Sequence, residues 1–202
     1  MRVAVLLLAA ILCPGSAAAD APERIVSTPT GDVKVSLAPA GADGPQEGIG
    51  HGLIAAPPGR VYRALQDVEH WHEFMPFLEQ STARPQKDGS VESFQRLELP
   101  FPLGRRSYRI RLRSRIDPAP GGTVWHLDWT YVPGSGTVED HHGSWTLTAA
   151  PDGTTRATLH LYTDPGGFLP AAAVDRGTFE TLPWIFHGLR QHVRRSRYDD
   201  AK

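Results

Sequence analysis

The segment 54–77, IAAPPGRVYRALQDVEHWHEFMPF, constrains the fold more than any other part of the chain. Its Pro-Pro-Gly turn at 57–59 ends an extended stretch and can begin a helix, because the first N–H groups of a helix have no internal partner. Val61, Leu65 and Val68 then recur with a helical period, which predicts a short amphipathic helix. Strand-like runs and one long helix follow, so we expect a concave sheet facing a helix, with a pocket between them.

The middle of the chain is typical of an antiparallel meander. Asp-Gly turns at 88–89 and 152–153, with longer Pro/Gly breaks at 118–122 and 133–136, separate the runs. Because the breaks are short, successive strands should pair antiparallel. An N-terminal pair and one further strand precede the meander, and we expect about six to eight strands in the sheet. The strand-like runs are 24–37 (the pair), 50–55, 78–84, 90–99, 105–116, 123–132, 139–148 and 154–163.

Alternating residues assign the two faces of this sheet. The apolar face carries Tyr108, Ile110, Leu112 and Ile116, then Trp125, Leu127, Trp129 and Tyr131, then Ala157, Leu159 and Leu161. The opposite face carries Arg109, Arg111, Arg113 and Arg115, then His126, Asp128 and Thr130, then Arg156, Thr158 and His160. A sheet with one apolar face must cover that face with another layer.

A last helix over about residues 170–197 is the expected cover. Pro183 removes one backbone hydrogen bond and should bend this helix. We therefore expect a gap near Pro183, between the helix and the sheet, and firmer packing toward the C-terminus. The apolar stripe that should face the sheet consists of Phe179, Leu182, Phe186, Leu189 and Val193.

The first residues have the pattern of a secretory signal. Met1-Arg2 precedes an apolar stretch at 3–12, which is too short to span a bilayer, and three alanines at 17–19 suit a signal peptidase. Bulky Leu12 before Cys13 disfavours lipid attachment. The mature chain would begin near Asp20 without a cysteine, so a disulfide and a thiol nucleophile are excluded. We expect a bacterial, periplasmic protein.

Charge excludes one class of partner. The chain has 21 Lys and Arg against 22 Asp and Glu, a formal net charge of −1. Such a balance has none of the electrostatic character of proteins that bind nucleic acid. We expect no nucleic-acid partner and no transmembrane anchor, which leaves room for transient membrane contact.

Several short motifs, in this order and spacing, together resemble one family. They are A-P-P at 56–58, D-V-x-x-W-x-x-x-M-P at 67–76, P-F-P-L at 100–103, V-P-G-S-G at 132–136, G-S-W at 143–145 and D-P-G-G at 164–167. Over about residues 46–195 the sequence resembles the START-like, helix-grip domains of the polyketide cyclase/dehydrase and lipid transport superfamily, also called SRPBCC. The resemblance implies an α+β fold in which a curved antiparallel sheet grips a long C-terminal helix. Short helices should follow the first core strand.

The signal pattern and the resemblance together give a domain division, and the resemblance implies a hydrophobic cavity between sheet and helix. Residues 1–19 would be the signal peptide and 20–202 a single domain, with N-terminal strands and a loop at 20–45 and the helix-grip core at 46–197. Each aromatic residue of the apolar face either lines that cavity or fills a core. The expected lining residues are Trp71, Phe74, Met75, Phe101, Tyr108, Ile110, Trp125, Trp129, Trp145, Phe179, Leu182 and Phe186.

No catalytic or metal-binding set stands out in the sequence. Adjacent His141 and His142 in a strand would point to opposite faces, so the histidines are expected on the surface or at the cavity rim rather than around a metal. The arginine stripe is typical of a solvated face. Ser135 lacks the strand-to-helix elbow of a nucleophile. An acid or base would have to point into the cavity, and Asp128, Glu92 and Glu98 qualify by residue type alone.

Three functions remain open. The favoured one is an exported binding or carrier domain for a hydrophobic small molecule, such as a lipid, quinone or polyketide-like compound, without a cofactor. The second is a cyclase or dehydratase on the same scaffold, and the third is a protein-interaction module with a filled core. An apolar pocket favours the first, a buried titratable group in it the second, and a filled core the third. The sequence does not specify the ligand or the oligomeric state.

The signal pattern makes a direct prediction. Export should remove residues 1–19, because the small residues before Asp20 suit signal peptidase. The intact mass of the exported protein should therefore match a chain that begins at Asp20. Recovery of the full-length chain from the cytoplasm alone would contradict this prediction.

Overall fold

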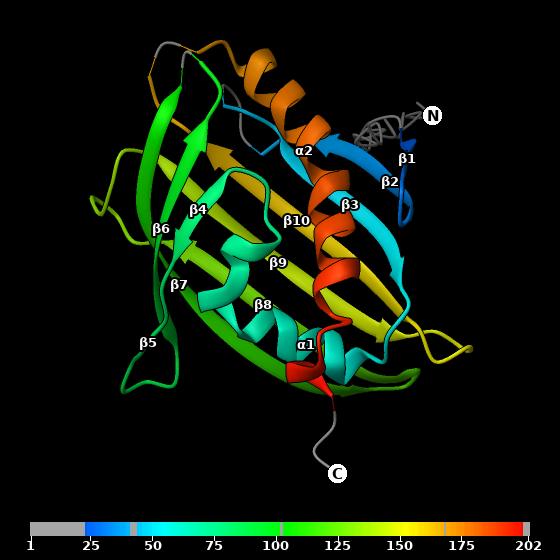
Figure 1. Cartoon of the computed structure of the whole chain (residues 1–202). Helices are drawn as coiled ribbons and strands as arrows, with labels where there is room; N and C mark the ends of the chain where they lie inside the picture. The colour runs from blue at the N-terminus through cyan, green and yellow to red at the C-terminus, as the bar shows by residue number, and fades with distance from the viewer. Residues whose placement is uncertain (1–22, 41–43, 102, 168, 200–202) are drawn as a thin grey trace, which may run out of the picture.

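A computed structural model of the chain describes residues 23–40, 44–101, 103–167 and 169–199. The expected signal peptide at 1–19 lies outside these residues. One strongly curved antiparallel sheet forms the body of the domain, and the long C-terminal helix α2 (Ala171–His192) lies across its concave face (Figure 1). This is the helix-grip architecture that the sequence predicts, and the sheet is not closed into a barrel.

The sheet has ten strands, more than the six to eight expected. The predicted N-terminal pair joins the same sheet, because β2 pairs with β3, and the predicted strand at 78–84 divides into β4 and β5. The order across the sheet is β1-β2-β3-β10-β9-β8-β7-β6-β4, and β5 also pairs with β6. The strands are β1 (Arg24–Thr28), β2 (Gly31–Ala38), β3 (Glu47–Ile54), β4 (Leu78–Ser81), β5 (Arg84–Pro85), β6 (Val91–Leu99), β7 (Gly104–Ala119), β8 (Gly122–Tyr131), β9 (Asp140–Ala149) and β10 (Thr155–Asp164).

The segment 54–77 contains α1 (Pro58–Gln66) and the 3-10 helix η1 (Val68–Glu73). Helix α1 has proline in its first turn and packs its apolar side against β8 and β9. Trp71 is buried, and its indole N–H donates to the carbonyl oxygen of Leu65 at 2.9 Å. This bond fixes the turn between the two helices, so the aromatic loop that follows has a defined position.

Helix α2 lies directly on three alternate glycines of β3. A methyl group at Gly48 would come within 2.7 Å of Leu182, and one at Gly50 would come within 2.8 Å of the Phe186 ring. Phe186 is fully buried and meets Trp145 edge-on at 5.2 Å. The third glycine, Gly52, also faces the Phe186 ring. We name this contact between α2 and Gly48, Gly50 and Gly52 the glycine seat.

The glycine seat corrects the expectation of a gap near Pro183. Leu182, Pro183 and Phe186 are all buried, since glycine leaves room for large helix side chains to approach the strand. Leu189 and Val193 are buried as expected. The helix ends at His192 rather than near residue 197, and a 3-10 turn, η2 (Ser196–Tyr198), follows it.

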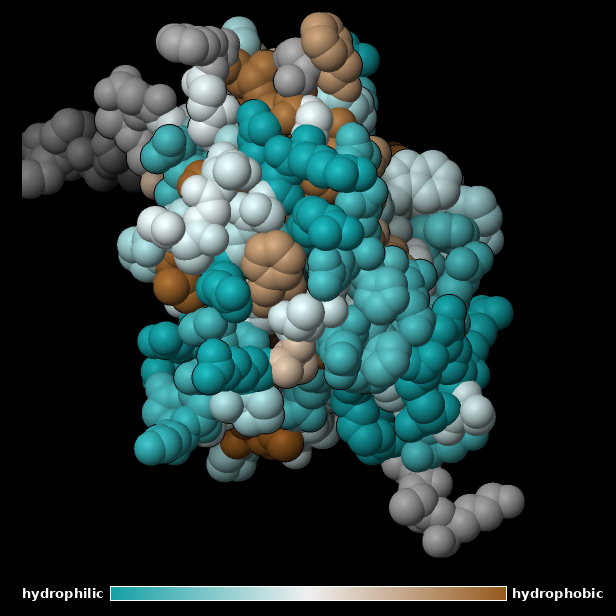
Figure 2. Space-filling model, turned by 60° about the vertical axis from the view of Figure 1, so that its left-hand side comes forward, coloured by the Kyte–Doolittle hydropathy of each residue, from teal (hydrophilic) through white to brown (hydrophobic). Residues whose placement is uncertain are grey.

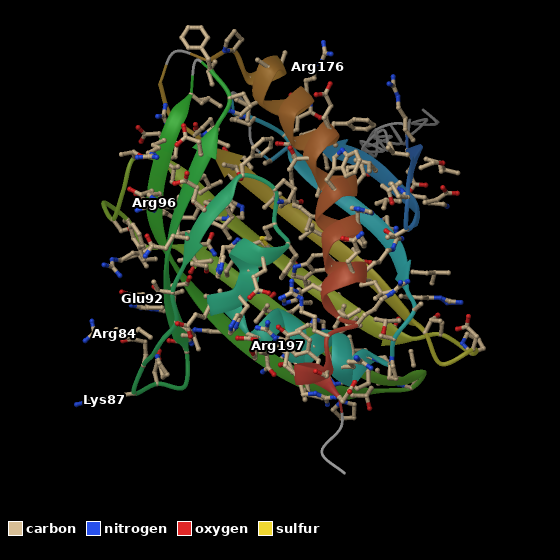
Figure 3. The ribbon with its side chains drawn as sticks, in the orientation of Figure 1. Arg84, Lys87, Glu92, Arg96, Arg176 and Arg197 are labelled. Carbon is tan, nitrogen blue, oxygen red and sulfur yellow. The ribbon has the colours of Figure 1, made fainter. Side chains whose placement is uncertain are left out.

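The predicted faces of the sheet are confirmed with one exception. Leu112 is buried and its neighbour Arg111 is exposed. Ile116 is 55% exposed, which is wrong for the predicted apolar face, because it lies close to the turn into β8, where the β7–β8 hairpin runs past its cover. Figure 3 shows Arg84 and Lys87 pointing outward at the edge of the domain formed by β5 and the turn that follows it.

The arginine stripe of β7 faces solvent and is paired with carboxylates. Arg109 reaches Glu92 at 3.4 Å, Arg113 reaches Asp88 at 2.9 Å and Arg115 reaches Asp117 at 2.5 Å. The partners therefore come from β6, from the turn before it and from β7 itself. Exposed pairs of this kind contribute about 0–1 kcal/mol each, so this face has a solvated rather than an anion-binding character.

Candidate functional site

The structure gathers most of the expected lining residues on the concave face of the sheet. Trp71 meets Trp129 edge-on at 6.0 Å, and Trp145 meets Phe186. These contacts join residues of η1, β8, β9 and α2 into one cluster. The expected residues that are buried there are Trp71, Phe74, Tyr108, Ile110, Trp129, Trp145, Leu182 and Phe186.

The other four expected residues lie elsewhere. Met75, Trp125 and Phe179 are partly buried and pack against the edge of the cluster. Phe101 is 97% exposed and does not line the space between sheet and helix. It lies in the tight β6–β7 connection, where the Leu103 N–H donates to the Pro100 carbonyl oxygen and turns the chain away from the core.

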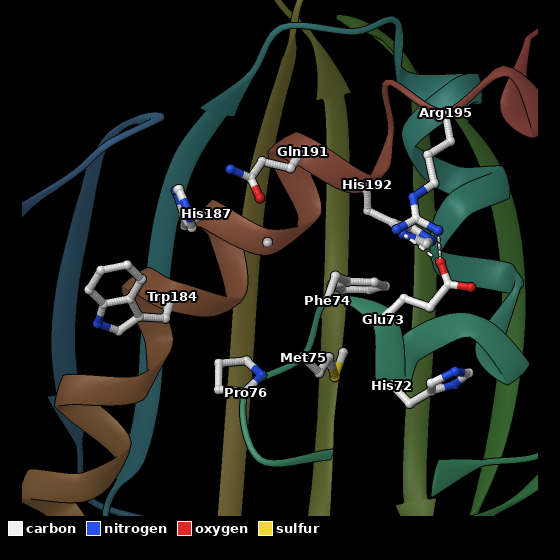
Figure 4. A pocket seen from close by; sticks show the side chains of 11 residues that line it. His72, Glu73, Phe74, Met75, Pro76, Trp184, His187, Gln191, His192 and Arg195 are labelled. Atoms are coloured by element: carbon white, nitrogen blue, oxygen red, sulfur yellow. Dashed lines mark hydrogen bonds and ion pairs between the residues drawn. The ribbon is translucent and has the colours of Figure 1, made fainter. Parts of the chain in front are cut away.

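A pocket of about 450 Å³ opens beside this cluster, between the η1–β4 connection and the second half of α2 (Figure 4). We name it the η1–α2 pocket. Phe74, Met75, Pro76 and Trp184 supply its apolar walls, and Phe74 also belongs to the buried cluster. Phe74 therefore separates the pocket from the aromatic interior and contacts both. Its polar lining comes from His72, Glu73, His187, Gln191, His192 and Arg195.

Gly188 sets the shape of this pocket. A methyl group at Gly188 would collide with the carbonyl oxygen of Phe74. Glycine thus lets α2 approach the η1–β4 connection on one side while it contacts β3 on the other. Of the expected residues, only Phe74 and Met75 line the pocket. The pocket residues of α2 were not predicted, because they lie off the apolar stripe of the helix. Trp184, for example, is 52% exposed.

One wall of the η1–α2 pocket contains a buried histidine. His192 is 2% exposed, and its ring lies 4.7 Å from the Phe74 ring. Its Nε2 lies 2.7 Å from the Tyr198 hydroxyl, which in turn donates to the Asp67 carboxylate at 2.9 Å. Burial, with a smaller contribution from Arg197, lowers the pKa of His192 to about 4, so the imidazole is neutral at pH 7.

A carboxylate at the pocket rim is held by two arginines. Glu73 forms ion pairs with Arg195 and, at 3.4 Å, with Arg197. Its carboxylate also lies 3.7 Å from Nδ1 of His192, too far for a hydrogen bond. Figure 4 shows Glu73, His192 and Arg195 meeting at one end of the pocket.

A second histidine, His141, is buried on the concave face, which corrects its expected surface or rim position. Its Nδ1 lies 2.9 Å from the Thr163 hydroxyl and its ring 4.8 Å from that of Tyr108. Burial, with a smaller contribution from His142, lowers the pKa of His141 to about 3. His142 points to the outer face, where it contacts Asp140, so adjacent histidines do face opposite sides.

Three buried donors lack a partner among the described residues. They are the side-chain nitrogens Nε2 of Gln95, Nε1 of Trp129 and Nε1 of Trp145. An unsatisfied buried polar group costs about 1–3 kcal/mol. The interior therefore has unused capacity to bind acceptor atoms such as carbonyl oxygens.

The described ranges contain neither a metal-binding cluster nor a membrane-spanning helix. No three His, Cys, Asp or Glu side chains there are grouped so that they could hold a metal ion. Neither helix in that part of the chain combines the length and apolarity needed to cross a membrane.

Comparison with known families decides the identity of the domain. Residues 54–189 match the family model described as polyketide cyclase / dehydrase and lipid transport. The chain belongs to this family. The resemblance noted from the sequence is thereby confirmed, and membership places the chain among domains that bind hydrophobic ligands.

Solved structures with the same fold include lipid transfer proteins. The STAR-related lipid transfer protein of Xanthomonas axonopodis (fragment 25–204) has a TM-score of 0.71 at 20% identity, over 86% of this chain and 99% of that one. Human StAR-related lipid transfer protein 5 has a TM-score of 0.68 at 16% identity, over 90% and 88%.

A biosynthetic protein shares the fold as well. The di-domain ARO/CYC StfQ of the steffimycin pathway has a TM-score of 0.52 at 20% identity, over 74% of this chain and 45% of that one. Comparison with curated protein sequences gives no significant match. At these identities the structural matches establish the fold alone.

Burial of His141 predicts an acid-sensitive fold. The unfolded histidine binds a proton below its ordinary pKa of 6.5, whereas the folded one stays neutral down to about pH 3. Its contribution to stability is therefore lost as the pH falls from 6.5 toward 3, by up to about 1.4 kcal/mol per pH unit. Chemical denaturation at several pH values should show a shallower decline for His141→Leu than for the parent. Equal pH slopes for the two proteins would contradict the buried, neutral histidine.

Proposed function

We propose that this chain is an exported binding or carrier domain for a hydrophobic small molecule of the lipid, quinone or polyketide-like type. The η1–α2 pocket carries the proposal. Its volume of about 450 Å³ falls in the range of small-molecule sites, and its lining combines apolar and polar side chains. Phe74, Met75 and Trp184 supply apolar contact, and Phe74 links the pocket to the buried cluster.

The unpaired donors of the interior refine the ligand class. Gln95, Trp129 and Trp145 each present a buried N–H without a partner among the described residues. None of these donors lines the η1–α2 pocket, so a ligand whose apolar body carries acceptor oxygens would satisfy them only if the packing behind Phe74 opens to admit it. In this proposal the aromatic residues expected from the sequence contact the inner end of the ligand.

The energetics allow reversible binding. Burying about 300 Å² of apolar ligand surface is worth roughly 7 kcal/mol before the cost of association, which corresponds to micromolar affinity at best. That strength suits a carrier, because the ligand must also leave. In Figure 2 the visible face is largely hydrophilic, with hydrophobic residues in small separate areas. A broad apolar membrane-binding surface is absent from that face, so we expect at most transient membrane contact.

A cyclase or dehydratase is the alternative, and the pair of His141 and Tyr108 favours it. The two rings lie 4.8 Å apart on the concave face, and burial keeps both groups neutral by lowering the pKa of His141 and raising that of Tyr108. Both shifts move the pKa away from 7, so the pair can hydrogen-bond a ligand that reaches it, and proton transfer would require the bound ligand to bring one of the two pKa values back toward neutrality. Recovery of a ligand in chemically altered form after incubation with the protein would favour this alternative. The filled aromatic interior is the observation that would favour a protein-interaction module, and failure of the parent to bind an apolar probe would support that alternative.

A substitution in the exposed wall tests the binding proposal. Trp184→Ala should weaken binding of the neutral fluorophore N-phenyl-1-naphthylamine by about five- to thirtyfold, as expected for loss of a large aromatic contact. Because Trp184 is half exposed, the melting temperature should change little. The fluorophore is titrated into both proteins and its emission measured.

Ile116→Ala is the matched control, because Ile116 is also about half exposed but lies outside the pocket. It should leave the affinity unchanged. Failure of the parent to bind the fluorophore, or equal affinity in the Trp184 variant, would refute binding in the η1–α2 pocket.

A further inference from the structure

The hydrogen bonds that link Asp67, Tyr198 and His192 determine which nitrogen of the imidazole carries the proton. The Tyr198 hydroxyl has one hydrogen and donates it to the Asp67 carboxylate, which in its ionised form can only accept. The bond at 2.7 Å between Tyr198 and Nε2 must then use a hydrogen from His192. A neutral imidazole carries a single N–H, so Nδ1 is left with a free lone pair.

That lone pair has no partner within the described residues, although the group is deeply buried. His192 is 2% exposed, lies in the wall of the η1–α2 pocket, and its Nδ1 makes no hydrogen bond. The Glu73 carboxylate, which is itself an acceptor, lies 3.7 Å from this nitrogen. Two acceptors that face each other leave a position that only a hydrogen-bond donor can satisfy.

We propose that His192 Nδ1 is the polar anchor of the η1–α2 pocket and accepts a hydrogen bond from a hydroxyl group on the ligand. The inference rests on the proposed function and adds one chemical requirement to it: the hydrophobic ligand carries a hydroxyl. Tyr198 and Asp67 act as positioning residues, because they hold the imidazole in the tautomer that leaves the lone pair on Nδ1.

The surroundings favour a neutral donor over a charged one. Glu73 is already paired with Arg195 and Arg197, so one negative charge faces two positive ones and a ligand cation would be repelled. An ionised carboxylate has no hydrogen to donate to Nδ1. A hydroxyl supplies the hydrogen without adding charge, and the Phe74 ring beside the imidazole offers a surface for the apolar body that carries it.

Access to Nδ1 requires a small movement of the rim. The atom is covered in the structure, and the Glu73 carboxylate lies over it. The Glu73 side chain is 21% exposed and its arginine partners are more exposed still, so this carboxylate can shift toward solvent with its ion pairs kept. The hydroxyl then occupies the vacated position.

A matched pair of probes tests the anchor. Isothermal titration calorimetry with 2-naphthol and 2-methoxynaphthalene compares two molecules that differ in the ability to donate one hydrogen bond. The parent should bind 2-naphthol about fivefold more tightly, which is the value of one net hydrogen bond. His192→Leu should abolish this preference, whereas His192→Asn, which can place an amide oxygen near the Nδ1 position, should retain part of it.

The tautomer has its own readout, which needs no change at His192. In ¹⁵N NMR of histidine-labelled parent protein, His192 should show an unprotonated Nδ1 whose signal moves on addition of 2-naphthol and stays in place with 2-methoxynaphthalene. Tyr198→Phe removes the acceptor for Nε2–H, so both tautomers should become populated and the preference for 2-naphthol should fall.

The outcomes separate the two claims. Equal affinity of the parent for both probes, with an unmoved Nδ1 signal, overturns the anchor and leaves hydrophobic binding intact. A preference for 2-naphthol that persists in His192→Leu overturns the anchor as well, since another acceptor such as Glu73 would then be responsible. Failure of the parent to bind either probe overturns both the anchor and the proposed function.

Discussion

The contact between α2 and the glycines of β3 is the interaction on which the rest of this domain depends. A helix with large side chains can lie this close to a strand only where the strand has no side chains of its own, and Gly50 provides that space for the Phe186 ring. With the helix in this seat, Phe186 reaches Trp145 and closes the concave face. Each aromatic residue of the cluster then has a fixed partner, which gives the interior a single arrangement rather than a loose apolar space.

The position of α2 also determines what lies beside it. Gly188 brings the helix against the backbone of Phe74, and the η1–α2 pocket is the space left next to that contact. The end of the same helix carries His192 to the Tyr198 hydroxyl, which is bonded to Asp67. Packing, pocket and polar chain are therefore consequences of one helix position. The domain combines a well-filled aromatic interior with an open, partly polar pocket at its surface. The proposed ligand, with an apolar body and a polar group, matches this combination.

Local periodicity explains what the sequence could predict and what it could not. Alternation places Leu112 inside, and the helical period places Phe186 on the buried stripe, because both patterns depend on near neighbours alone. Phe74 was found as a site residue because aromatic residues crowd its segment. His192 was missed, since the hydrogen bonds that hold it run through Tyr198 to Asp67, which lies far away in the sequence, and no local pattern joins the three residues. The expected gap near Pro183 was wrong because the effect of alternate glycines appears only once a helix is known to lie on them.

The substitution Gly50→Ala tests the glycine seat most directly. The added methyl group would lie 2.8 Å from the Phe186 ring, so α2 must shift or the ring must leave its rotamer. The free energy of unfolding should fall by about 1–3 kcal/mol. Gly177 lies in α2, and a methyl group there would have nothing within 4 Å. Gly177→Ala should therefore raise the free energy of unfolding by about 0.5–1 kcal/mol. Adding Phe186→Leu to Gly50→Ala should recover part of the loss by making room for the methyl group. A Gly50→Ala protein as stable as the parent in chemical denaturation, with unchanged binding of the apolar fluorophore, would contradict this account.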